Sequence, residues 1–153
     1  MIEIEEITTN KAGICRTILE ALPDRFGNQR VVELIVKEAP LLSMLGARDG
    51  DDYVGMMTVK RQTPQTIEIR ALGVMPDRHR QGIGRALIQE VESYAIQQGA
   101  VLLSLKTVGP SDPNPIYQNT RAFYHALGFV QVEELPLWGP DAACLLMVKS
   151  LKP

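Results

Sequence analysis

An arginine-rich loop that contains two glycines is the part of the sequence whose residue types most clearly suggest chemistry. It runs from Arg78 to Arg85, with Gly82 and Gly84 inside it and a further arginine at position 80. In the first turn of a helix the backbone N–H groups have no intrahelical partner, and the helix dipole adds partial positive charge there. Placed before a helix, such a loop is suited to bind a phosphate or a pyrophosphate.

Two common phosphate-binding motifs do not fit this loop. A Walker loop requires Gly-x-x-x-x-Gly-Lys followed by Ser or Thr, and the sequence holds no such run. A dinucleotide fingerprint requires a third glycine three residues after Gly84, where Leu87 stands. A compact Gly-x-Gly anion loop remains, and the alternative is an ordinary glycine-rich helix start with a solvated basic rim.

The composition of the chain restricts the class of protein. With 153 residues it has the size of one domain, predicted over residues 1–153, and its formal net charge of −2 argues against nucleic acid as a partner. The two cysteines, Cys15 and Cys144, lie far apart and outside any Cys-x-x-Cys spacing, so we expect buried thiols and no metal site. The N-terminus does not resemble a signal peptide and no apolar run approaches the roughly 20 residues of a membrane span, so we expect no membrane partner and a cytoplasmic location.

Hydrophobic periodicity predicts helices and strands in alternation around the loop. An antiparallel meander ends with the strand before the glycines, and this strand, the helix after the glycines and the strand at residues 100–105 form a strand–helix–strand unit. This order predicts an α/β (α+β) fold with a mixed sheet. The predicted helices are residues 11–22, 30–37, the helix from the glycine loop to residue 99, and 120–127; the predicted strands lie around residues 2–4 and at 41–47, 53–60, 66–74, 100–105, 129–133 and 144–151.

The strand that leads into the loop departs from simple alternation. Ile67, Ile69 and Ala71 share one face, yet Leu72 and Val74 are apolar on the other. A one-sided sheet would not show this pattern, whereas a β-bulge near residues 72–73 would explain it. Bulges often re-aim a strand beside a functional site.

Motifs on both sides of the loop resemble one known family. Val74-Met-Pro-Asp, the run Arg80-Gln-Gly-Ile-Gly-Arg-Ala-Leu87 and Phe123-Tyr-His-Ala-Leu-Gly-Phe129 are together similar to the GNAT superfamily of N-acetyltransferases, over essentially the whole chain. The resemblance implies a mostly antiparallel mixed sheet with helices on both faces. It also implies that the sheet is splayed between the strand ending at Val74 and the strand ending near Leu105.

The resemblance also implies a cofactor, acetyl-CoA, and a set of residues that bind it. The pyrophosphate would lie on the amides of Arg80, Gln81, Gly82, Ile83, Gly84 and Arg85, and the pantetheine arm would pair with the backbone of Leu72, Gly73 and Val74. Tyr124 matches the family's tyrosine beside the thioester sulfur. Two departures stand out: His79 replaces an Arg or Gln, and Tyr117 and Thr120 replace an Asn and an Ala.

The acetyl transfer that this family implies requires a neutral amine. Deprotonating a lysine-like amine at pH 7 costs about 4–5 kcal/mol, and an α-amine about 1–1.5 kcal/mol, so a base matters most for alkyl amines. Glu68 is our candidate base, directly or through water, because it precedes the predicted bulge on the same nominal face as Arg70. The alternative is a surface pair between Glu68 and Arg70.

The tetrahedral oxyanion and the leaving thiolate require further groups. An N–H freed at the bulge, that of Val74, would stabilise the oxyanion. Proton transfer to the thiolate from the phenol of Tyr124 is uphill by about 2 kcal/mol in water, so it requires a dry site. The alternative for Tyr124 is core packing with Phe123 and Phe129.

The acceptor is not defined by the sequence beyond an amine of a small molecule or peptide. Phe26, Arg70 and Trp138 are candidate substrate contacts, although Phe26 and Trp138 can equally be core-covering loop residues. Relatives also suggest a possible homodimer by analogy. We therefore expect an acetyl-CoA-dependent N-acetyltransferase with direct transfer; the alternative is a non-catalytic acyl-CoA-binding or regulatory module of the same fold.

Overall fold

The computed structural model describes residues 1–140 and 142–151, which fall into two compact units. The first unit holds Met1–Lys60 and Ile69–Tyr94, and the second holds Arg61–Glu68 and the chain from Ala95 onward. The described strands form a seven-stranded sheet in the order β1-β2-β3-β4-β5-β7-β6. The pairings β1–β2, β2–β3, β5–β7 and β6–β7 are antiparallel, so the predicted mixed and mostly antiparallel α/β fold is confirmed.

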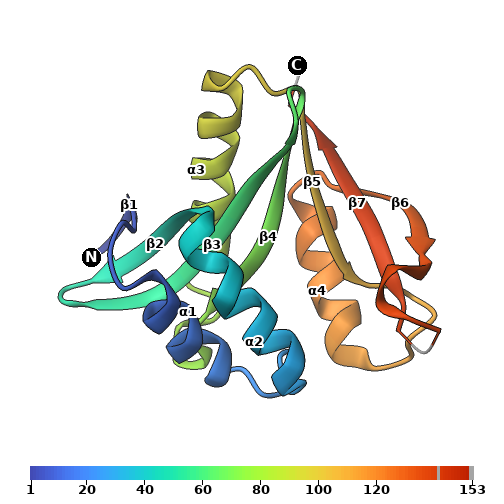
Figure 1. Ribbon diagram of the computed structural model, residues 1–153, viewed down its shortest axis with the longest axis horizontal. Coiled ribbons are helices and arrows are strands. Elements are labelled where there is room, and N and C mark those ends of the chain that lie inside the picture. Colours follow the sequence, from blue (N-terminus) through green and yellow to red (C-terminus); the bar gives the residue numbers. More distant parts are fainter. Residues whose placement is uncertain (141, 152–153) are drawn as a thin grey trace. The chain divides into compact units, whose positions relative to one another are not determined.

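The first unit consists of strands with helices on both faces (Figure 1). A Cβ on Gly73 of β4 would lie 3.0 Å from Ile18 of α1, whereas a Cβ on Gly55 of β3 would lie 3.0 Å from Ile83 of α3. The two helical layers therefore pack directly on the strands. Its elements are β1 (Ile2–Glu6), α1 (Lys11–Glu20), α2 (Gln29–Glu38), β2 (Ser43–Asp49), α3 (Ile83–Gln97) and most of β3 (Asp52–Thr63) and β4 (Thr66–Val74).

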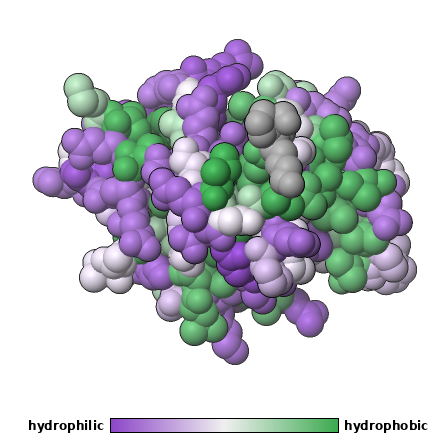
Figure 2. All heavy atoms as spheres, turned by 90° about the horizontal axis from the view of Figure 1, so that it is seen from above, coloured by the Kyte–Doolittle hydropathy of each residue, from purple (hydrophilic) through white to green (hydrophobic). Residues whose placement is uncertain are grey.

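The second unit carries the C-terminal half of the chain. It contains β5 (Leu102–Val108), α4 (Pro115–Ala126), β6 (Val130–Leu135) and β7 (Cys144–Ser150). The end of the β3–β4 hairpin belongs to it, because Gln65 accepts hydrogen bonds from the N–H groups of Val101 (2.8 Å) and Leu102 (3.2 Å). Figure 2 shows apolar side chains reaching the surface among hydrophilic ones; in this unit the exposed large ones past α4 are Val130, Val132, Leu137 and Trp138.

Several element boundaries differ from the predicted ones by a few residues, and local chemistry explains the starts of α4 and β2. Helix α4 begins at Pro115, five residues before the predicted start at 120, because Asn114 caps it by accepting from the N–H of Ile116 at 3.1 Å. Proline suits the first position of a helix, whose N–H has no partner. Strand β2 begins at Ser43, not at 41, because a 3₁₀ turn, Ala39–Leu41, comes first.

Within residues 1–140 and 142–151, none of the helices combines the length and the apolar character needed to cross a membrane.

Candidate functional site

The loop between β4 and α3 has the backbone geometry of an anion site. The first bond of α3 runs from the N–H of Ala86 to the carbonyl of Gly82 at 3.0 Å. The N–H groups of Ile83, Gly84 and Arg85 precede that bond and so lie in the turn where a helix leaves its donors unpaired. This turn can therefore donate several hydrogen bonds to one phosphate group.

Two residues of this loop adopt left-handed backbone conformations. Gly82 has φ +79°, and Arg80 has φ +65°, which is unusual for a residue with a side chain. Among the described residues no atom lies within 4 Å of the Cβ position of Gly82, so the space over the loop backbone is open. The loop therefore fits a pyrophosphate that approaches the main chain closely.

The arginines around the loop divide into two kinds. Arg78 is already engaged, since its guanidinium lies 2.7 Å from the carboxylate of Asp49. This hydrogen bond is the main reason why the pKa of Asp49 is lowered. Arg80 and Arg85 are exposed. Of the three arginines that suggested an anion site, these two are the ones with side chains directed to solvent beside the loop.

The end of β4 is tightly constrained. Gly73 packs so closely on α1 that a Cβ would lie 3.0 Å from Ile18 and 3.3 Å from Leu22. The carbonyl of Val74 lies 2.8 Å from Nε2 of His79. His79, one of the two departures from the family pattern, therefore contacts one of the backbone groups that we predicted to pair with pantetheine.

Two neighbouring residues of β4 both make contacts with α1 or α2. Arg70 forms bonds of 3.0 and 2.9 Å to the carboxylate of Glu38 on α2, and the next residue, Ala71, lies in the core cluster made by α1 and α2. Regular pleating would direct these neighbouring side chains to opposite faces. A long arginine side chain can bend back to α2 from the other face, and a bulge at Leu72–Gly73 stays a prediction.

Glu68, the candidate base, is a buried residue of the second unit. It is 3% exposed, so it is not a surface residue, and its pairing with Arg70 stays a prediction. Its Oε2 accepts a hydrogen bond from Nζ of Lys106 on β5, and its Oε1 accepts one from Nε2 of Gln62 on β3 at 3.1 Å. The predicted base is therefore a carboxylate held by a cation and an amide.

Lys106 and Gln62 are the residues that sequence analysis missed. The predicted strand ended at residue 105, one position before Lys106. A single lysine at the end of a nearly continuous apolar strand is a usable signal, because a cation in that position needs a partner.

Tyr124 is a buried residue of α4, 8% exposed. Its ring makes edge contacts with Phe123, at a centroid distance of 5.3 Å, and with Phe129, at 5.7 Å. The packing that we considered as the alternative is therefore present. It does not compete with a role for the hydroxyl, since a packed ring fixes the direction of its phenol.

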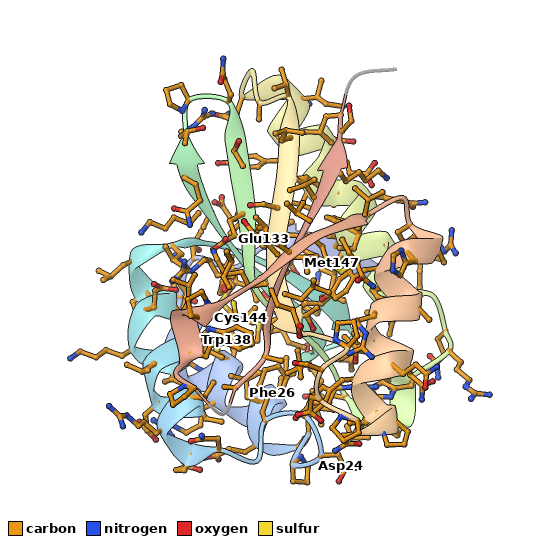
Figure 3. The ribbon with its side chains drawn as sticks, turned by 90° about the vertical axis from the view of Figure 1, so that its right-hand side faces the viewer. Asp24, Phe26, Glu133, Trp138, Cys144 and Met147 are labelled. Carbon is orange, nitrogen blue, oxygen red and sulfur yellow. The ribbon has the colours of Figure 1, made fainter. Side chains whose placement is uncertain are left out.

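The candidate acceptor contacts have different environments, and Figure 3 labels two of them. Phe26 follows α1 and packs, half-buried, against the core cluster of α1 and α2. Trp138 lies in the 3₁₀ turn after β6 and is 45% exposed, which leaves its ring accessible. Arg70 is held by Glu38.

Both cysteines are buried, as predicted. Burial raises the pKa of the Cys15 thiol to about 11 and also raises the pKa of Cys144. Neither thiol is therefore poised to act as a nucleophile at neutral pH. Among the residues that the structure describes, no group of three His, Cys, Asp or Glu side chains could hold a metal ion.

A strand, a glycine-containing loop and a helix packed on a mixed sheet form an arrangement that is suited to a phosphorylated cofactor. The family model described as the acetyltransferase (GNAT) family matches residues 12–129, and the chain belongs to this family. The predicted resemblance is thereby confirmed.

Solved structures of other proteins have a similar fold. A protein described as a GNAT-family acetyltransferase from Desulfovibrio desulfuricans is 22% identical, with 99% of this chain and 100% of that chain covered and a TM-score of 0.83. An aminoglycoside 6'-N-acetyltransferase complexed with coenzyme A is 21% identical (99% and 98% covered, TM-score 0.73). A GNAT acetyltransferase from Elizabethkingia anophelis with acetyl-CoA bound is 15% identical (97% and 97% covered, TM-score 0.74). The predicted cofactor agrees with the ligands of the last two structures.

Proposed function

We propose that the protein is an acetyl-CoA-dependent N-acetyltransferase that transfers the acetyl group directly to a primary amine of a small molecule or peptide. The observation that carries this proposal is the loop after β4, where the first-turn N–H groups of α3 follow left-handed Arg80 and Gly82. Membership of an acetyltransferase family supports the reaction class. The cofactor supplies a thioester, and the protein supplies binding, a base and an acid.

The first unit provides the proposed cofactor contacts. Residues 80–85 hold the pyrophosphate through their amides, with the side chains of Arg80 and Arg85 adding positive charge beside it. The backbone of residues 72–74 pairs with the pantetheine arm. Gly73 is suited to this because its contact with α1 fixes the strand position, so the backbone groups are preorganised.

Glu68 is the proposed general base for the acceptor amine. A base is needed because an alkyl ammonium group requires about 4–5 kcal/mol for deprotonation at pH 7. The carboxylate of Glu68 is buried and hydrogen-bonded, so its orientation is fixed. A fixed base within reach of an amine contributes on the order of 10²–10⁴-fold to the rate.

Tyr124 is the proposed acid that protonates the departing sulfur, and the N–H of Val74 is the proposed donor to the oxyanion. Burial of the tyrosine supports the first role, because a phenol donates to a thiolate efficiently only where water is excluded. A backbone N–H supports the second, since it needs no reorganisation during the reaction.

Direct transfer is supported by the state of the two thiols. An acyl-enzyme mechanism requires an activated nucleophile, with a lowered pKa or an adjacent base. Cys15 and Cys144 are instead buried, and the pKa of each is raised. The acceptor amine itself is therefore the proposed nucleophile.

Release of thiol from acetyl-CoA, measured against a panel of amines, tests the proposal. The panel should include aminoglycosides, polyamines, amino acids and peptide N-termini. Aminoglycosides are included because one protein of similar fold is described as an aminoglycoside 6'-N-acetyltransferase. We expect thiol release that depends on one class of amine, with the acetylated amine found by mass spectrometry. Acetyl-CoA binding without acceptor-dependent thiol release would favour the non-catalytic module.

A further inference from the structure

Glu68 has more hydrogen-bond partners than a general base requires. The second unit joins this carboxylate to a cation and an amide, and the three side chains come from three different strands, β4, β5 and β3. Nζ of Lys106 donates to Oε2 and Nε2 of Gln62 donates to Oε1 at 3.1 Å. The side chain of Glu68 is 4% exposed and that of Lys106 is 24% exposed, so the ion pair is largely withdrawn from water.

Cys144 on β7, labelled in Figure 3, is a buried residue whose pKa is affected by both Lys106 and Glu68. Burial is the main cause of the raised pKa of Cys144, while Lys106 lowers and Glu68 raises it. Both charges therefore act on a residue that is 0% exposed.

A carboxylate in such a place stays ionised only if something compensates for its lost hydration. Burial favours the neutral acid, whereas a cation within about 4–6 Å favours the charged form. A general base has to be ionised to accept a proton. The charge of Lys106 therefore bears directly on whether Glu68 can act.

The two hydrogen bonds also fix the orientation of the Glu68 carboxylate. An ionised carboxylate has about four lone-pair sites on its two oxygens. Lys106 and Gln62 occupy one site on each oxygen and so fix the plane of the carboxylate.

We propose that Lys106 is a positioning residue for the acyl transfer, which keeps the Glu68 carboxylate ionised and, together with Gln62, holds it in the orientation that receives the proton of the acceptor amine. The inference rests on the proposed function, in which Glu68 is the base. Lys106 contacts no reacting atom and acts through Glu68.

The test compares Lys106→Met, Lys106→Arg and Glu68→Gln over a range of pH. Without the cation, Glu68 takes up a proton at higher pH, so the acid limb of kcat/KM for Lys106→Met should move upward by roughly one to three pH units. Lys106→Arg retains the charge and should restore the wild-type limb. Lys37→Met, which removes one exposed lysine of α2, is the control for loss of a positive charge.

A second readout does not depend on activity. Titration of the Glu68 side-chain carboxyl by ¹³C NMR, assigned by its absence in Glu68→Gln, should show the same upward movement in Lys106→Met. Lys106→Gln, which keeps a hydrogen-bond donor, replaces Lys106→Met if that variant does not fold. An unchanged carboxyl titration, or a scaled-down rate with an unchanged pH profile, would overturn the inference. Absence of thiol release in the wild-type protein would instead count against the proposed function, while the NMR titration would still decide whether Lys106 holds the charge of Glu68.

Discussion

Tyr124 combines two properties that a single substitution can separate. Its ring packs edge-on against Phe123 and Phe129, and aromatic pairs of this kind contribute about 0.5–1.5 kcal/mol each. Phenylalanine preserves the ring and removes only the hydroxyl. The packing role and the proposed acid role therefore make different predictions.

We expect Tyr124→Phe to lower kcat on the order of 100-fold, because a positioned acid contributes about that much, with little change in the dissociation constant of acetyl-CoA. Steady-state thiol release and calorimetric titration measure the two quantities. Tyr117→Phe, on the same helix, is the matched control and should leave turnover unchanged. Unchanged turnover in Tyr124→Phe would remove the acid role.

At the scale of elements, α1 and α2 are joined by a bidentate ion pair. Arg16 donates to both carboxylate oxygens of Glu33, at 2.5 and 2.9 Å, and Gln29 adds a bond of 3.0 Å. These hydrogen bonds, that of Arg16 foremost, lower the pKa of Glu33 from 4.5 to about 2. A lowered pKa in the folded state contributes stability that is present above the unfolded value and is lost as the pH falls through the folded value.

Glu33→Gln should therefore remove a stability contribution that the wild-type protein has at neutral pH and loses between about pH 4.5 and 2. Denaturant unfolding at pH 7 and at pH 3 measures it. The difference in the free energy of unfolding between Glu33→Gln and the wild type should be smaller at the lower pH, because Glu33 is then partly protonated. It should also be smaller in high salt, because the ion pair is exposed. Glu90→Gln, on α3 and without an ion pair among the described residues, is the control. An equal loss of unfolding free energy in Glu33→Gln at both pH values would contradict a stabilising role of the Arg16–Glu33 pair.

The elements differ in how far local sequence determines them. The start of α3 was predictable, because Gly82 and Gly84 act within one turn. The start of α4 could not be predicted in this way. The prolines of residues 110–115 are typical of a loop, although Pro115 occupies a favourable first helical position. The burial of Glu68 could not be predicted either, since it depends on β3, β4 and β5 becoming neighbours and on a lysine distant in sequence.

At the scale of the whole molecule, the family assignment and the fold agree with a single claim, that the chain binds acetyl-CoA through the first turn of α3. Two glycines of the chain allow an effect on cofactor binding to be separated from an effect of backbone strain on stability. Gly82 and Gly50 both have positive φ, +79° and +62°, and among the described residues neither has an atom within 4 Å of its Cβ position. Alanine at either site costs about 1–2 kcal/mol of backbone strain.

Calorimetric titration of acetyl-CoA into the wild-type protein, Gly82→Ala and Gly50→Ala is the most direct measurement. Both variants should lose similar stability, but only Gly82→Ala places a methyl group where the phosphate approaches the backbone. We expect the dissociation constant to rise roughly tenfold or more in Gly82→Ala, equivalent to about 1.4 kcal/mol, and to stay at the wild-type value in Gly50→Ala. Equal affinity in all three proteins would contradict binding at this loop.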